Sequence, residues 1–212
     1  MKIAVPWVVV LALTAACSTN KPLEGIRPES LAPLAVVQFA TPEIQRHSPG
    51  TIAGGGLLFG GFGMEAVAAS EGQKLRERCG LEDFGRLAVR EFVVAAPRVV
   101  PSFAGMRVVD KPVDATPRLP DSYVLTVKTS AVWIYTFGGA QGLNAFATAT
   151  ITSPAGSVLW ERMGSYSSRQ AGRVRPIEEL EADSCRLLKE EMVDAARAVV
   201  SEWISDLMSG KS

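Results

Sequence analysis

The stretch Tyr123-Val124-Leu125-Thr126-Val127-Lys128-Thr129-Ser130-Ala131-Val132-Trp133 decides the fold, because apolar and polar residues alternate along it. This period of two predicts a half-buried strand. Glycines at positions 138, 139 and 142 predict a turn, and alternation resumes over 143–152. Ser153-Pro154-Ala155-Gly156 predicts a second tight turn before a third strand over 157–168. We therefore expect an antiparallel meander at the centre of the protein.

The segments around the meander supply the helices. A long apolar stripe at helical spacing begins after Pro176 and predicts a C-terminal helix laid on the sheet. Upstream, 34–39 predicts a buried strand, 65–79 and 82–96 predict two helices, and 106–109 predicts a short strand. Gly80 is expected to cap the first of these helices and Pro97 to end the second. This order indicates the α/β class: a two-layer sandwich with a short first strand, two helices, an antiparallel meander and a long C-terminal helix packed on the sheet.

The composition excludes several classes of protein. The 212 residues include 22 basic and 22 acidic side chains, 47% hydrophobic residues and 21% charged residues. This balance argues against a basic nucleic-acid-binding protein and against a disordered chain. With 19 glycines and 13 prolines, the chain is not collagen-like or of low complexity. The length fits one or two domains with a well-filled core.

The first residues predict export. A positive start, an apolar run over 3–13 and two small residues describe a signal peptide that is too short to span a membrane. Leu13-Thr14-Ala15-Ala16-Cys17 resembles the lipobox of bacterial lipoproteins. That resemblance implies cleavage before Cys17, a diacylglycerol on its thiol and an acyl chain such as palmitate on the new N-terminus. Because Ser18 rather than Asp follows, it also implies the outer membrane, in the inner leaflet facing the periplasm.

These features divide the chain into three parts. We expect a lipoprotein signal peptide over 1–16, a lipidated cysteine and tether over 17–33, and a single periplasmic α/β domain over 34–208. Three prolines favour the tether, whose reach would be at most about 50 Å. The mature chain would have 196 residues and a net charge of −1, because Lys2 is lost with the signal peptide.

Two further cysteines remain once Cys17 carries lipid. In the oxidising periplasm, Cys79 and Cys185 favour one disulfide, and two separate buried thiols are the alternative.

A Gly-rich, uncharged segment interrupts the domain over 48–64. Its apolar residues Leu57, Leu58, Phe59 and Phe62 lie among seven glycines. One interpretation is a loop whose apolar residues fold back on the core. The other is an exposed flap that contacts a membrane, a partner or a second copy.

Side chains suited to catalysis are scarce. His47 is the one histidine, it lies in an expected polar loop over 40–48, and no Gly-x-Ser-x-Gly motif accompanies it. One histidine and two distant cysteines do not make a metal site. We therefore predict a protein that is not an enzyme, with no metal and no cofactor beyond the acyl chains on Cys17.

Two surface features leave alternatives open. Aromatic residues gather near the first meander turn, and we expect most of them in the core and a few along a groove for a partner strand or a glycan. An arginine run around the last strand is either a solvated face or a contact for anionic lipid headgroups. The aromatic residues are Trp133, Tyr135, Phe137 and Phe146, and the arginines are Arg162, Arg169, Arg173 and Arg175.

The strand over 34–39, the motif Gly156-Ser157-Val158-Leu159-Trp160-Glu161 and the closing helix together resemble envelope lipoproteins of the CsgG, LpoB and TolB amino-terminal type. The chain also resembles lipoproteins that carry a similar Gly-rich block. The resemblance implies a small periplasmic binding domain. Function does not follow from such a fold alone.

The expected function is a lipid-anchored, non-enzymatic binding or assembly domain of the bacterial cell envelope. Its partner would be another envelope protein or a second copy of the chain, and no nucleic acid is expected. The alternative is an accessory lipoprotein of an envelope transport or secretion system that oligomerises. That alternative needs a long amphipathic hairpin, and the sequence contains no such pair of alternating segments in an insert.

Overall fold

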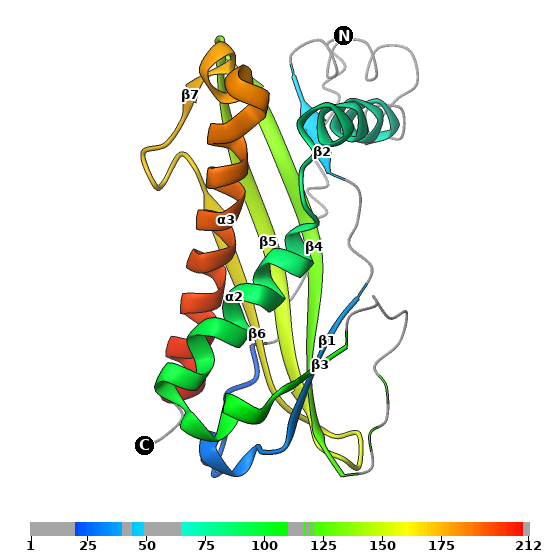
Figure 1. The fold of residues 1–212 in the computed structure, drawn as a ribbon, viewed down its shortest axis with the longest axis vertical. Coiled ribbons are helices and arrows are strands. Elements are labelled where there is room, and N and C mark those ends of the chain that lie inside the picture. Colours follow the sequence, from blue (N-terminus) through cyan, green and yellow to red (C-terminus); the bar gives the residue numbers. More distant parts are fainter. Residues whose placement is uncertain are drawn as a thin grey trace, which may run out of the picture.

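Three long antiparallel strands form the centre of the fold. The structure, a computed structural model, describes residues 20–39, 44–48, 65–109, 117, 119 and 121–209. Strands β4 (Tyr123–Phe137), β5 (Ala140–Thr152) and β6 (Val158–Ser167) pair as the alternating pattern predicts (Figure 1). Gly138 and Gly139 form the β4–β5 turn with φ of +59° and +81°. Glycine suits this turn because it adopts positive φ without steric cost.

Shorter strands extend the sheet in the order β3-β1-β4-β5-β6. β1 (Leu34–Gln38) runs parallel to β4 and to β3 (Arg107–Val108), and β7 (Arg175–Pro176) pairs with β5. β2 (Gln45–His47) pairs in parallel with Trp133–Tyr135 of β4. The expectation of a polar loop over 40–48 is therefore wrong at 45–47, because pairing with the exposed edge of β4 makes a strand of this polar segment.

Two helices cover one face of the sheet. α2 (Phe84–Val99) and α3 (Ile177–Ser209) pack against each other and against the long strands (Figure 1). Trp160 of β6 and Trp203 of α3 are among the largest fully buried side chains between the layers. The protein is thus an α/β two-layer sandwich with a long C-terminal helix on the sheet, as predicted.

A further helix over 65–79 ends at Gly80, whose φ of +58° fits the predicted cap. Gly72 brings this helix against the chain before β2, where a Cβ would overlap the carbonyl oxygen of Ile44. Short 3-10 turns over Pro28–Ser30 and Pro101–Gly105 complete the described elements. None of the helices in the described part of the chain has the length and apolar character needed to cross a membrane.

Two helix predictions need correction. Pro97 does not end α2, which continues to Val99 and closes with a hydrogen bond from Val100 N to Ala96 O. Both Ala96 and Val100 are buried, so packing holds the last turn despite the missing N–H of the proline. The second correction concerns α3, which is not one continuous helix. Its backbone leaves helical geometry over Ala182–Cys185, and residues 183–185 have positive φ.

The segment over 20–33 is part of the fold and not a free tether. Leu23 is 1% exposed, Leu31 is 0% exposed, and both belong to the hydrophobic core. Lys21 pairs with Glu161 of β6 through two backbone hydrogen bonds of 2.9 Å. The prolines that suggested a tether instead accompany a 3-10 turn, so the expected boundary at residue 34 is wrong. Cys17 and the signal peptide lie outside the described residues.

Candidate functional site

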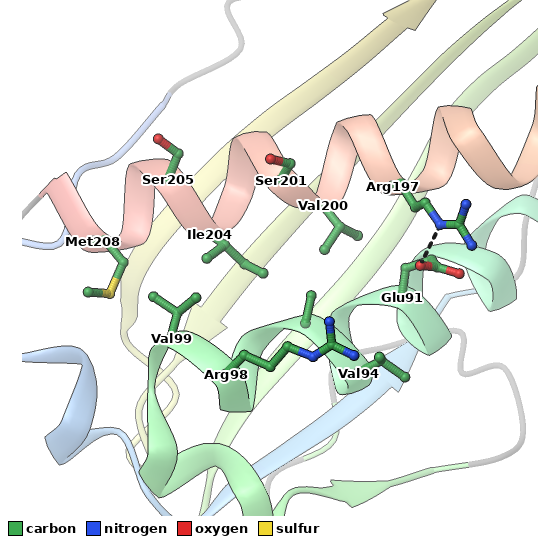
Figure 2. Close-up of a pocket in the computed structure, with 11 residues that line it drawn as sticks. Glu91, Val94, Arg98, Val99, Arg197, Val200, Ser201, Ile204, Ser205 and Met208 are labelled. Carbon is green, nitrogen blue, oxygen red and sulfur yellow. Dashed lines mark hydrogen bonds and ion pairs between the residues drawn. The ribbon is translucent and has the colours of Figure 1, made fainter.

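An open groove lies between α2 and α3 on the outer side of the helix layer. Its volume is about 670 Å³, within the range of ligand pockets. Val99, Ile204 and Met208 converge from the two helices at one end (Figure 2). Val94 and Val99 are 52% and 43% exposed, respectively, although both are apolar. The floor is therefore a hydrophobic surface that the rest of the described chain leaves uncovered.

Charged side chains border the groove. Arg197 Nε lies 3.2 Å from Glu91 Oε2 and ties the two helices together at one end (Figure 2). Arg197 also pairs with Asp194 at 3.3 Å. Arg98 extends along α2 toward Val94 (Figure 2) and has no ion pair within the described residues. The rim thus offers one free positive charge beside an apolar floor.

The groove follows the helices over several turns. α3 lines it from Arg197 to Met208, a span of about 17 Å at 1.5 Å per residue. Sequence reasoning missed this site because Val94 and Val99 look like core residues of an amphipathic helix. The available indication was the width of the apolar arc on 84–99, which exceeds what one buried face needs.

The predicted disulfide is present. Cys79, at the end of the helix over 65–79, is bonded to Cys185 at the interruption of α3, with Cα atoms 5.4 Å apart. Both cysteines are buried. The bridge joins the peripheral helix to the layer that carries the groove.

A buried polar network lies near the middle of α3. Glu191 accepts hydrogen bonds from the Tyr166 hydroxyl and, at 2.9 Å, from Ser168 Oγ. Ser168 Oγ also accepts a bond of 2.6 Å from the backbone N–H of Leu143. Burial, reinforced by the bond to Glu191, raises the pKa of the Tyr166 phenol. Because Ser168 is fully buried, this serine–carboxylate contact is closed to a substrate and pins β6 to α3.

His47 makes packing and polar contacts with its neighbours in the sheet. Its Nε2 lies 3.2 Å from Gln45 Oε1, and its ring packs edge-on to Trp133 at 6.2 Å. Within the part of the chain that the structure describes, no group of three or more His, Cys, Asp or Glu side chains is arranged to hold a metal ion.

Three of the four aromatic residues predicted to cluster, Trp133, Tyr135 and Phe146, lie on the sheet face away from the helices; the side chain of Phe137 lies outside the described part of the structure. Trp133 is 38% exposed and packs on Phe146 with ring centroids 5.4 Å apart. Tyr135 is half-buried and lines a hollow of about 580 Å³ with Arg169 and Val174. These three residues are thus partly on the surface rather than in the core.

The structure separates the four arginines of the predicted basic run. Arg162 pairs with Glu202 at 3.0 Å and Asp206 at 3.4 Å, which places it against α3. Arg173 pairs with Asp194, which raises the pKa of its guanidinium, and Arg175 pairs with Glu179. Arg169 is exposed and has no ion pair in the described part of the chain. One arginine of the four is therefore available to a ligand.

Several predicted site residues lie outside the described residues. These are the lipidation site Cys17 and the apolar residues of the Gly-rich segment, Leu57, Leu58, Phe59 and Phe62.

Comparison with known proteins identifies no family for the chain. No family model matches it, and no curated protein matches it. Among solved structures, it is similar to a neuraminyllactose-binding hemagglutinin homolog from Helicobacter pylori, with 11% identity, a TM-score of 0.41 and 88% of each chain covered. It is also similar to a hypothetical protein from Chlamydia trachomatis, with 8% identity, a TM-score of 0.35, and 82% of this chain and 98% of that chain covered. Likenesses of this size carry no argument about function, which rests on the site itself.

Proposed function

We propose that the chain is a lipid-anchored, non-enzymatic binding protein of the bacterial cell envelope, and that the α2–α3 groove binds its partner. Acylated Cys17 would hold it in the outer membrane, in the inner leaflet facing the periplasm. The observation that carries the proposal is the groove: exposed Val94 and Val99 beside Arg98, which has no ion pair within the described residues. The apolar residues are too close together to be scattered surface exposures.

The groove favours an amphipathic helix with an acidic residue as its occupant. The groove follows α3 for about 17 Å, a length that accommodates roughly three turns of a third helix. Such a helix would place apolar side chains on Val94, Val99 and Ile204, and a carboxylate near Arg98. Local concentration at the membrane would strengthen the complex without any catalytic step.

Site-specific photo-cross-linking in whole cells tests this function. A photoreactive amino acid is placed at Val94 or Val99 of the lipidated protein, and at Val67 as a control position of comparable exposure on the helix over 65–79. We expect the same envelope protein at both groove positions and not at Val67, joined through an apolar segment that carries an acidic residue. Arg98→Glu should weaken this adduct, because it turns the attraction into repulsion.

Three outcomes would overturn the proposal. The same adducts at Val67 and in the groove would show that the groove has no specificity. An adduct with a second copy alone would favour the oligomerising alternative. Stronger cross-linking of the Arg98→Glu protein would contradict the assigned charge of the partner.

A further inference from the structure

The linker between the proposed lipid and the fold is very short. Asn20 Oδ1 accepts a hydrogen bond of 3.2 Å from Met163 N, and the backbone of Lys21 forms a β-bridge with the backbone of Glu161. The chain is therefore held against β6 from Asn20 onward. Cys17 is three residues away along the chain, so its Cα lies at most about 11 Å from that of Asn20. An acyl chain on Cys17 would enter the bilayer beside this strand.

The register of β6 shows which sheet face lies next to that entry point. Gly164 faces α3, because a Cβ there would lie 2.8 Å from Val199 Cγ1 and Trp203 Nε1. Its neighbour Met163 therefore points to the opposite face, together with its cross-strand partner Thr148. We call the sheet surface that points away from α2 and α3 the open face. Its side chains come from β4, β5 and β6 and include Lys128, Trp133, Phe146, Thr148 and Met163.

The open face has the chemistry of a membrane-contacting surface. It carries Trp133 and Phe146, whose rings pack edge to face, and Met163 at its β6 edge. From the strand spacings, Trp133 is about 16 Å from Met163. Lys128 is exposed on the same face and has no ion pair within the described residues. Tryptophan and lysine are residues that settle at the headgroup level of a bilayer.

The helix layer has the opposite character. The segment of α3 contains nine acidic and three basic side chains, and that of α2 contains one acidic and three basic, so the layer as a whole is net negative. Glu202 and Asp206 lie near β6, where both are paired with Arg162. On the open face Glu161, which accepts a hydrogen bond from Thr150, offsets Lys128. An anionic membrane surface would therefore repel the helix layer more strongly than the open face.

We propose that the open face of the sheet lies on the phospholipid surface, with Trp133 in the headgroup region and with Arg169, which lines a hollow together with Tyr135, adding a positive charge. This inference rests on the proposed function, because it requires the acyl chains on Cys17. Stable anchoring takes more than one interaction, and the face adds an apolar and a basic one to the lipid. The α2–α3 groove, on the other side of the sheet, then faces away from the membrane toward its partner.

Tryptophan fluorescence provides the test. Of the three tryptophans that remain after signal cleavage, Trp160 and Trp203 are 0% exposed, so Trp133 is the one that lipid can reach. The mature acylated protein is reconstituted into phosphatidylethanolamine–phosphatidylglycerol vesicles with brominated or unbrominated acyl chains. The emission of Trp133 is obtained by subtracting the emission of the Trp133→Phe protein from that of the wild-type protein. We expect brominated lipid to remove most of this difference.

The matched control moves the probe to the groove. In Trp133→Phe/Val94→Trp protein, the introduced indole lies in the helix layer and should show no loss of emission with brominated lipid. The proposed contact between the open face and the membrane is overturned if Trp133 of the acylated protein keeps its emission in brominated lipid. It is also overturned if the tryptophan introduced at position 94 loses as much emission as Trp133. The intact mass tests the anchor separately: a mature chain without acyl chains on Cys17 overturns the proposed function and the docking with it.

Discussion

Gly164 of β6 lies directly against Trp203 of α3, because a Cβ at position 164 would be 2.8 Å from Trp203 Nε1 and 3.1 Å from the carbonyl oxygen of Val199. The absence of a side chain at this position lets the helix layer approach the sheet. The contact lies in the layer interface that also supports the groove.

Gly164→Ala should lower the free energy of unfolding by about 1–3 kcal/mol, because the added methyl group overpacks this contact. Urea unfolding followed by circular dichroism measures the change. Gly105→Ala is the matched control, since a Cβ at Gly105 meets nothing within 4 Å, and its effect should stay within about 0.5 kcal/mol. Equal losses in the two variants would contradict the close packing of β6 and α3.

The raised pKa of the Tyr166 phenol predicts that the protein loses stability at high pH. Burial and the bond to Glu191 raise the pKa of the phenol in the folded state above the ordinary value near 10. The folded state therefore keeps its proton where the unfolded state releases it, so stability falls as the pH rises above about 10. Urea unfolding at pH 8 and at pH 11 measures this loss, and Tyr166→Phe should reduce the difference between the two. A variant with an unchanged difference would show that other groups cause the loss.

The sheet could be predicted from the sequence because its information is local. Alternation over 123–133 and 143–152 specifies strands with one buried face, and the turn glycines specify their antiparallel pairing. The helix over 65–79 and its cap at Gly80 were likewise predictable from spacing and from one glycine. The disulfide followed from an even number of remaining cysteines, and its presence in the structure confirms it.

Other features depended on distant contacts and left no local pattern. β2 is three polar residues that become a strand by pairing with β4. Leu23 and Leu31 lie among prolines without any periodicity, so their burial depends on the rest of the core. The groove required the placement of α2 beside α3, which decides that Val94 and Val99 are exposed. The sequence reports apolar character, and only packing decides which apolar residues stay uncovered.

The disulfide predicts a measurable redox dependence of stability. It closes a loop of 106 residues, which corresponds to about 4–5 kcal/mol in the chain-entropy model. Urea unfolding with and without a thiol reductant should differ by about that amount. The Cys79→Ser/Cys185→Ser protein should resemble the reduced wild type and show no response to the reductant. A wild-type midpoint that the reductant leaves unchanged would contradict a stabilising bridge.

Leu31 distinguishes an integrated N-terminal segment from a free tether. Leu31 is fully buried in the core, and its N–H donates to Pro28 O at 3.1 Å. Leu31→Ala should lower the free energy of unfolding by about 2–5 kcal/mol, because it leaves a cavity. Glu24→Ala, at an exposed position of the same segment, should have little effect. Urea unfolding of the unlipidated mature protein measures both changes. A Leu31→Ala protein as stable as wild type would return residues 20–33 to the role of a tether, and the lipid would then no longer hold β6 close to the membrane.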